Sequence, residues 1–327
     1  MKVFVAGATG ALGKQLVPQL VARGHEVVGM THSTEKQDLV RSLGARPVVA
    51  DALDPDQVAQ AVAEAEPDVI VHQMTALSGD FDMRHIDRFF ALTNRLRTEG
   101  TDHLLAAGRA VGVKRFVAQS YAGWPFARIG GAVKTEDDPL DPEPAKALQP
   151  ALDAIRHLEE SVTGASWTTG IALRYGGFYG PGTGMRTDGE QTQLLKKRQW
   201  PIIGDGDGVW SFVHIADAAT ATVEAIEHGE RGVYNVVDDE PAPVREWLPA
   251  IAEAIGAPKP RRVPRWLGRL LAGEAAIVMM TESRGASNAK AKRELAWTQR
   301  YPSWRTGFRD GLGDGAAGVQ AAGRTAR

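Results

Sequence analysis

Several features are missing from this chain of 327 residues, and each absence excludes a class of protein. There is no cysteine, which excludes a disulfide scaffold, a thiolate metal site and a cysteine nucleophile, and which suits a reducing cytoplasm. No apolar run approaches the roughly 20 residues that span a bilayer, and the first residues do not resemble a signal peptide. A formal net charge of −2 argues against a broad basic surface for nucleic acid. We therefore expect a cytoplasmic protein that binds neither membranes nor nucleic acids.

Short apolar strands alternate with amphipathic helices in the first part of the chain. Strands are expected at 2–6, 25–30, 48–50, 68–72 and 115–118. The last connection among them reads as one long helix near 82–111. Short connections between alternating strands and helices indicate a parallel sheet with helices on both faces. The pattern predicts an α/β fold built on a doubly wound parallel sheet.

A glycine-rich turn joins the first strand to the first helix. It reads Gly7-Ala8-Thr9-Gly10-Ala11-Leu12-Gly13. Glycines allow a tight turn, and free backbone N–H groups at the start of a helix bind a pyrophosphate. A glycine-rich loop is weak evidence by itself, but this one lies between a strand and a helix of a βαβ unit. It predicts a dinucleotide site with these members: Gly7, Thr9, Gly10, Ala11, Leu12 and Gly13.

The chain resembles the extended short-chain dehydrogenase/reductases, the NAD(P)-dependent epimerase/dehydratase family, over nearly its whole length. Besides the glycine motif, the resemblance rests on Asp51-Ala52-Leu53, Val71-His72-Gln73-Met74-Thr75-Ala76, Leu173-Arg174-Tyr175-Gly176-Gly177-Phe178-Tyr179-Gly180-Pro181-Gly182 and Phe212-Val213-His214-Ile215-Ala216-Asp217. It implies that the adenine is held by Asp51 and Ala52. It also implies a ribose contact from Gln73, Met74 and Thr75, and a nicotinamide contact from Tyr175, Gly177 and Phe178.

Pattern and resemblance together imply two lobes. A Rossmann-type NAD(P)-binding domain is expected over 1–175, with 211–239 returning to it. Residues 176–210 and 240–312 are expected to form a smaller, mostly helical substrate lobe beside it. The Gly/Ala-rich end, 313–327, reads as a flexible tail.

The end of the second strand lacks the carboxylate that normally binds the adenosine ribose and repels a 2′-phosphate. That place falls at Thr31, followed by His32 and Ser33, and Lys36 lies one helical turn away. All of these side chains can donate hydrogen bonds to a phosphate. Ser33 also fits the N-cap of the next helix, and the two roles are compatible. The pattern favours NADP(H) over NAD(H).

The family's usual reaction needs a tyrosine, a lysine four residues later and a nearby serine or threonine. The phenol gives its proton to the substrate oxygen, and the lysine lowers the phenol's pKa. Only five tyrosines are present, and none is followed by lysine at the fourth position. On the helix that carries this pair in the family, Ala151 or Leu152 stands at the position of the tyrosine, and Ile155 or Arg156 stands at the position of the lysine. Any proton donor must therefore be a different group.

Three residues are candidates for the catalytic chemistry. Ser120 follows the fifth strand, where the family keeps its catalytic serine or threonine beside the cofactor. Tyr121 next to it is the first candidate for proton donor, and Lys134 in the following loop can supply positive charge. Each has a plain structural interpretation as well: Tyr121 as a packing aromatic at a strand end, and Lys134 as an exposed lysine.

Large side chains in the loops predict the substrate pocket. They are Trp124, Phe126, Met185, Trp200 and Trp210. Such a pocket suits a small apolar or aromatic molecule better than a nucleotide sugar. The alternative is that several of these side chains only pack the smaller lobe, because large aromatic residues dominate cores.

Three functions remain open on the sequence. The first is an NADP(H)-dependent oxidoreductase that acts on a small carbonyl or alcohol with a non-standard proton donor. The second is an epimerase, dehydratase or isomerase that keeps its cofactor bound. The third is a cofactor-binding sensor without redox catalysis. No metal site is expected, and the family resemblance implies a homodimer formed through helices near 82–111 and 145–163.

Overall fold

The computed structural model describes residues 1–77 and 83–313, and a parallel sheet of seven strands lies at its centre. The strand order is β12-β7-β5-β4-β1-β2-β3. The strands are β1 (Lys2–Ala6), β2 (Glu26–Thr31), β3 (Arg46–Val49), β4 (Val69–His72), β5 (Arg115–Tyr121), β7 (Thr169–Tyr175) and β12 (Gly232–Val236). Neighbouring strands pair in parallel throughout this sheet. The predicted α/β fold with a doubly wound sheet is confirmed.

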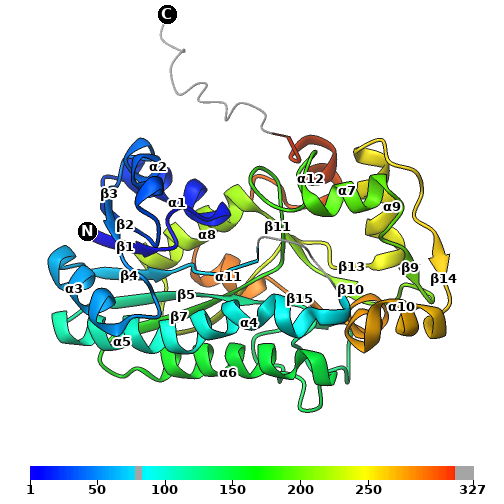
Figure 1. Ribbon diagram of the computed structural model, residues 1–327, viewed down its shortest axis with the longest axis horizontal. Helices are drawn as coiled ribbons and strands as arrows, with labels where there is room; N and C mark the ends of the chain where they lie inside the picture. The colour runs from blue at the N-terminus through cyan, green and yellow to red at the C-terminus, as the bar shows by residue number, and fades with distance from the viewer. Residues whose placement is uncertain (78–82, 314–327) are drawn as a thin grey trace, which may run out of the picture.

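Helices cover both faces of the sheet (Figure 1). One face carries α1 (Ala11–Ala22) and α8 (Ile215–His228). The other carries α3 (Pro55–Ala65), α4 (Ile86–Arg97), α5 (Glu99–Val111) and α6 (Gln149–Gly164). Side chains of β1 alternate between the two apolar clusters, with Val3 and Val5 in one and Phe4 and Ala6 in the other. Burial on both faces explains why the strands read as continuous apolar runs.

The single helix predicted near 82–111 is wrong in one respect, because α4 and α5 are separate helices. Thr98 breaks them apart, with φ −96° and ψ −83°. Its hydroxyl donates to the carbonyl oxygen of Asn94 at 3.1 Å, and the carbonyl oxygen of Leu96 accepts from the His72 ring at 3.1 Å. The His72 bond occupies a carbonyl oxygen of the last turn of α4, whereas the carbonyl oxygen of Asn94 still accepts from the Thr98 N–H at 2.9 Å. Residue 82 itself lies outside the described residues.

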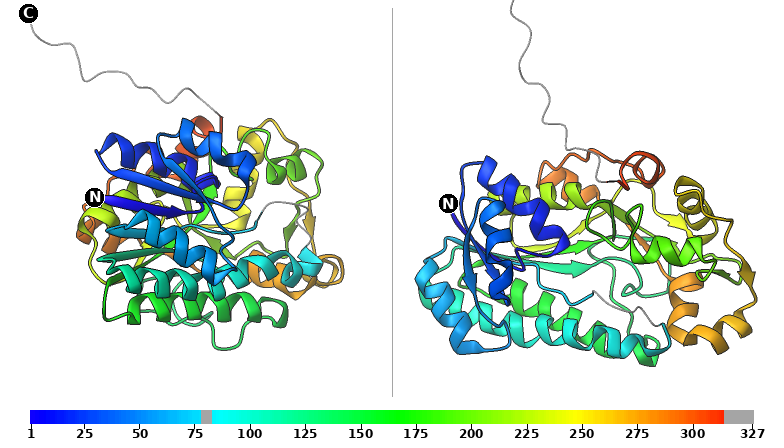
Figure 2. Two further views of the ribbon diagram at one scale, coloured as in Figure 1. Left: turned by 60° about the vertical axis from the view of Figure 1, so that its left-hand side comes forward. Right: turned by 45° about the horizontal axis from the view of Figure 1, so that its top comes forward.

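A smaller, mostly helical lobe packs against one end of the sheet (Figures 1 and 2). Its helices are α7 (Glu190–Lys196), α9 (Val244–Ala254), α10 (Arg265–Ile277), the π-helix η4 (Val278–Glu282) and α12 (Trp304–Asp310). Trp247 and Trp304 are fully buried in its core. Of the predicted tail, 314–327 lies outside the described residues. Within 1–77 and 83–313, no helix has the length and apolar character needed to cross a membrane.

The remaining elements are short. The helical ones are η1 (Thr34–Lys36), α2 (Gln37–Ser42), η2 (Met83–His85), η3 (Lys146–Leu148) and α11 (Ala289–Glu294). The strands outside the main sheet are β6 (Val133–Lys134), β8 (Gly177–Tyr179), β9 (Ile202–Ile203), β10 (Val209–Trp210), β11 (Phe212–His214), β13 (Ala242–Pro243), β14 (Arg262–Val263) and β15 (Gly285–Ala286). Each of these strands forms a two-stranded pair that ties a loop of the smaller lobe in place.

Candidate active site

The glycine-rich turn lies at the carboxyl end of β1, where the strand order of the sheet reverses. Gly7 has φ +97°, and a Cβ there would stand 2.8 Å from the carbonyl oxygen of Gln73. A Cβ on Gly13 would stand 2.4 Å from the carbonyl oxygen of Gly7. Only hydrogen fits at these two positions, so the glycines bring α1, the turn and the segment after β4 into direct contact. Ligands of doubly wound sheets bind at this reversal point.

The start of α1 is open to an anion. Gly10 is its N-cap, no side chain caps the helix, and its first turn carries no acidic residue. A Cβ built on Gly182, in the turn that follows β8, would lie 4.0 Å from Ala11. Two glycine-containing segments therefore face each other across the helix N-terminus. These residues fit a nicotinamide dinucleotide, since α1 can hold the pyrophosphate with its N–H groups and no carboxylate competes for them.

The predicted adenosine-side residues lie at the ends of β2 and β3. Thr31 is buried, and its hydroxyl accepts from the backbone N–H of Ser33 at 3.3 Å. The Ser33 hydroxyl donates to the Glu35 carboxylate, which lowers the pKa of that carboxyl. His32 and Lys36 are exposed. The charged groups that follow β2 on this segment are thus the Glu35 carboxylate, which accepts from Ser33, and the exposed Lys36 ammonium.

The other predicted cofactor residues lie at or just after the ends of β3, β4 and β7. The Asp51 carboxylate accepts from the N–H of Leu53 at 2.9 Å, and the carbonyl oxygen of Ala52 contacts the His103 ring at 3.0 Å. Gln73 donates to the Tyr175 phenol at 3.4 Å. Met74 and Thr75 follow Gln73 in the chain, and Gly177 and Phe178 begin β8. The ring centroid of Phe178 lies 5.3 Å from that of Tyr175.

Ser120 does not have a free hydroxyl. It donates to Glu159 Oε1 on α6 at 2.5 Å. The same carboxylate accepts two bonds from Arg174 on β7, at 2.7 and 2.6 Å. All three side chains are buried, so this triad ties together β5, α6 and β7. A hydroxyl committed to a buried carboxylate is a structural donor in this arrangement.

The face of α6 that should carry the family's tyrosine and lysine is apolar. Ala151, Leu152 and Ile155 are buried and belong to one apolar cluster with Trp124. Arg156 turns away from that cluster, donating to the carbonyl oxygen of Asp141 and to the Asp153 carboxylate. The helix therefore offers no proton donor where the family places one.

Tyr121 ends β5 beside this apolar face. Its ring centroid lies 6.4 Å from that of Trp124, and the ring packs against Gly123. Burial raises the pKa of the phenol to about 12, although the nearby positive charge of Arg97 opposes that rise. The phenol thus stays protonated at neutral pH and is a weaker acid than a free tyrosine.

Lys134 is not the exposed lysine of the plain interpretation. It is buried, and its ammonium donates to the carbonyl oxygen of Ile129 at 2.7 Å and to Asp138 at 3.1 Å. The β6–β15 pairing holds its backbone. Asp138 supplies the opposite charge. Both acceptors of the Lys134 ammonium lie in the same loop as the lysine, so the buried charge is paired locally.

The predicted substrate residues lie in three different surroundings. Trp124 lies beside Tyr121 and 6.5 Å from the Phe90 ring of α4. Trp200 and Trp210 pack 5.6 and 4.8 Å from the Trp247 ring in the smaller lobe. Phe126 is buried under the Arg174 guanidinium, and Met185 is buried in the core of the smaller lobe. Trp124 is the member of the set closest to the predicted proton donor, and Phe126 and Met185 are core residues.

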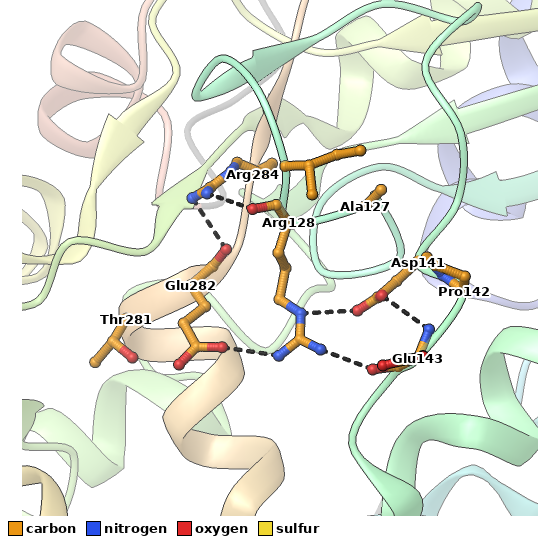
Figure 3. A pocket seen from close by; sticks show the side chains of 9 residues that line it. Ala127, Arg128, Asp141, Pro142, Glu143, Thr281, Glu282 and Arg284 are labelled. Carbon is orange, nitrogen blue, oxygen red and sulfur yellow. Dashed lines mark hydrogen bonds and ion pairs between the residues drawn. The ribbon is translucent and has the colours of Figure 1, made fainter.

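A cavity of about 430 Å³ lies elsewhere, between the loop after β5 and η4 (Figure 3). Arg128 crosses it and pairs with Asp141 at 2.9 Å and Glu282 at 2.8 Å. Arg284 donates to the carbonyl oxygens of Arg128 and Glu282. None of its lining residues belongs to the predicted cofactor or catalytic sets. Because Arg128 pairs with both Asp141 and Glu282, these ion pairs join the loop after β5 to η4.

Sequence reasoning missed Arg97. It is a buried cation at the end of α4 whose field reaches both Tyr121 and His72. Its burial, like that of Thr93 and Thr101 four residues to either side, is a property of the packed helices α4 and α5 and not of the local sequence.

Comparisons with known proteins agree with this geometry. The sequence model of the NAD dependent epimerase/dehydratase family matches residues 3–237. A 3-diazoavenalumate denitrifying reductase of Streptomyces is 44% identical over 96% of this chain and 99% of its own length. A 2-alkyl-3-oxoalkanoate reductase of Stenotrophomonas maltophilia is 28% identical over 79% of this chain and 77% of its own. The structure of UDP-glucose 4-epimerase of Thermus thermophilus in complex with NAD superimposes with a TM-score of 0.73, at 25% identity, covering 95% of this chain and 98% of that one.

Proposed function

We propose, on the premise that this chain belongs to the NAD-dependent epimerase/dehydratase family, that it is a reductase of a small aromatic diazo compound, which loses dinitrogen. The observation that carries the proposal is the apolar face of α6, where the family's proton donor and its lysine are replaced by Ala151 or Leu152 and Ile155 or Arg156. The name of the Streptomyces relative, a denitrifying reductase of a diazo compound, supports it.

The chemistry of this reaction suits a site without an acid. Replacing a diazonium group by hydrogen follows ArN₂⁺ + NAD(P)H → ArH + N₂ + NAD(P)⁺, in which the carbon–nitrogen bond breaks, dinitrogen leaves with no added proton, and the ring gains hydrogen. The bound cofactor supplies the hydride. Carbonyl reduction, in contrast, requires a proton for the oxygen. A site that lacks the family's tyrosine–lysine pair is therefore matched to the diazonium group.

The chain's own residues bind and orient the substrate in this proposal. Phe90, Trp124 and Tyr121 form a wall of rings with centroids 6.4 to 6.5 Å apart. Ring faces attract a cation, so this wall favours an arenediazonium ion over a neutral ring. Buried Leu152 and Ile155 keep water from that side of the substrate. Exclusion of water matters because arenediazonium ions hydrolyse.

Carbonyl reduction with Tyr121 as donor is the second candidate. It is favoured by the place of the phenol at the end of β5 and by its protonated state, with a pKa of about 12. The printed name of the Stenotrophomonas relative is that of an oxoalkanoate reductase. The two candidates differ in what they need from Tyr121.

Exchanging Tyr121 for phenylalanine separates them. We expect Tyr121→Phe to reduce 4-carboxybenzenediazonium at a rate within about threefold of the unchanged protein, with one dinitrogen released per cofactor oxidised. If Tyr121 were a general acid for a carbonyl substrate, the loss would be about 10²–10⁴-fold. Tyr234→Phe, on the edge strand β12, is the control for loss of a buried phenol. A hundredfold loss of diazonium reduction in Tyr121→Phe alone would refute the proposal.

We also propose that NADPH is preferred to NADH, since Thr31 stands where a ribose-binding carboxylate would be and Lys36 is exposed nearby. Equilibrium titration should give an affinity for NADPH at least about tenfold higher than for NADH. Lys36→Met should weaken NADPH binding about three- to tenfold and leave NADH binding unchanged. Lys197→Met, an exposed lysine that follows α7 in the smaller lobe, is the control. Equal affinities of the unchanged protein for both dinucleotides would contradict this preference.

A further inference from the structure

Arg97 is a buried arginine whose Nε atom has no hydrogen-bond partner among the described residues. It is the last residue of α4 and is 5% exposed, and within residues 1–77 and 83–313 neither a hydrogen bond nor an ion pair is found for it. Burial of a charge without a counter-charge is strongly unfavourable. Arg174, the comparable buried arginine nearby, is held by both oxygens of Glu159. Unlike Arg174, Arg97 therefore has donor capacity left for an anionic ligand.

Its place in the fold puts this charge near the carboxyl ends of β4 and β5. The Leu96 carbonyl, one residue before it, accepts from the His72 ring at the end of β4. Side chains of a helix tilt toward its N-terminus, and α4 begins beyond the carboxyl edge of the sheet (Figure 1). The charge of Arg97 lowers the pKa of both His72, at the end of β4, and Tyr121, at the end of β5, so its field reaches both strand ends.

The neighbouring titratable groups leave Arg97 uncompensated. Burial lowers the pKa of His72 to about 4, so this ring is neutral at pH 7. The phenol of Tyr121 is protonated, with a pKa of about 12. Glu159 attracts Arg97, but its oxygens are already taken by Ser120 and Arg174. No free carboxylate is therefore left for Arg97 among these groups.

Aromatic rings stand beside this charge. Tyr121, which feels the field of Arg97, packs against Trp124, and Trp124 packs against Phe90 of the same helix α4. A guanidinium next to a wall of rings matches a ligand that has a ring and a negative oxygen.

We propose that Arg97 binds an anionic oxygen, a carboxylate or a phenolate, carried by the aromatic substrate. The proposal rests on the proposed function for the aromatic character of that substrate, but it requires only binding. Arg97 becomes a specificity-determining residue, because a neutral analogue leaves its buried charge without a partner.

Binding to the protein loaded with NADP⁺ tests this without turnover. The probes are cinnamate, its neutral counterpart cinnamamide, and 4-nitrophenol, which ionises near neutral pH. We expect the unchanged protein to bind cinnamate or 4-nitrophenolate at least about tenfold more tightly than cinnamamide. Arg97→Met should bind the preferred anion about 10- to 100-fold more weakly, and its affinities for cinnamamide and NADP⁺ should be unchanged. Arg95→Met removes an exposed arginine of α4, paired with Glu99, and is the matched control.

Comparing the two anionic probes shows whether Arg97 binds a carboxylate or a phenolate oxygen. Loss confined to cinnamate identifies a carboxylate, and loss confined to 4-nitrophenolate identifies a phenolate. Arg97→Lys keeps the charge and should retain part of the preference, which decides the matter if Arg97→Met does not fold. Equal binding of cinnamate, 4-nitrophenolate and cinnamamide to the unchanged protein would overturn the proposal, as would an equal loss for all three probes in Arg97→Met. Failure of diazonium turnover with the anion preference intact would refute only the proposed function.

Discussion

Replacing Gly13 by alanine is expected to weaken binding of both NADH and NADPH by about 100-fold or more. The added Cβ would stand 2.4 Å from the carbonyl oxygen of Gly7 and 2.5 Å from that of Ala8, and neither backbone atom can move without displacing the turn. Shifting α1 misaligns N–H groups that each contribute about 1.5–3 kcal/mol to a charged ligand. Equilibrium titration of cofactor fluorescence measures the loss.

Gly164→Ala is the matched control, since Gly164 ends α6 with open space around its Cβ position. It should bind both dinucleotides as the unchanged protein does, with equal or slightly higher stability. Gly13→Ala should fold, at a cost of about 1–3 kcal/mol in free energy of unfolding. A folded Gly13→Ala protein with unchanged cofactor affinity would show that the dinucleotide lies elsewhere.

Replacing Glu159 by leucine is expected to lower the free energy of unfolding by about 3–5 kcal/mol. The change leaves the Arg174 guanidinium, which is 6% exposed, without its two bonds to the carboxylate, and it removes the acceptor of the Ser120 hydroxyl. An isolated buried charge is more costly than a buried ion pair or an apolar pair of similar volume. Urea denaturation followed by circular dichroism gives the value.

Two further variants make that result specific. Glu160→Gln, an exposed neighbour on α6, should change stability by no more than about 0.5 kcal/mol. Adding Arg174→Met to Glu159→Leu should recover much of the lost stability, since no unpaired charge remains. Unchanged stability of Glu159→Leu, or a double variant as unstable as the sum of its singles, would mean that the triad is not a coupled unit.

Local patterns were enough to predict the sheet and the cofactor turn. Val3 to Ala6 are apolar at every position because β1 is buried on both faces, and Gly7 and Gly13 stand where any Cβ would meet backbone. Periodicity alone could not show the break at Thr98. At that break the carbonyl oxygen of Leu96 accepts from His72, which is distant along the chain.

The candidate site was predicted less completely, because residues that are far apart in the sequence interact there. Ser120, Glu159 and Arg174 come from three elements, and their pairing emerges only when β5, α6 and β7 are assembled. Arg97 likewise reads as an ordinary helical arginine until α4 packs on α6. The absence of a tyrosine–lysine pair, in contrast, is a property of the sequence itself and could be established there completely.

We propose that this chain reduces an aromatic diazonium ion without taking a proton from a side chain. Proton uptake during turnover tests it most directly, measured with a pH indicator in weak buffer while dinitrogen and cofactor oxidation are followed, with the enzyme-free reaction subtracted. With 4-carboxybenzenediazonium and NADPH, we predict one dinitrogen per cofactor oxidised, no net proton uptake, and the same result in Tyr121→Phe. Turnover of a carbonyl compound with one proton taken up per cofactor, lost in Tyr121→Phe, and no turnover of the diazonium ion would contradict the account.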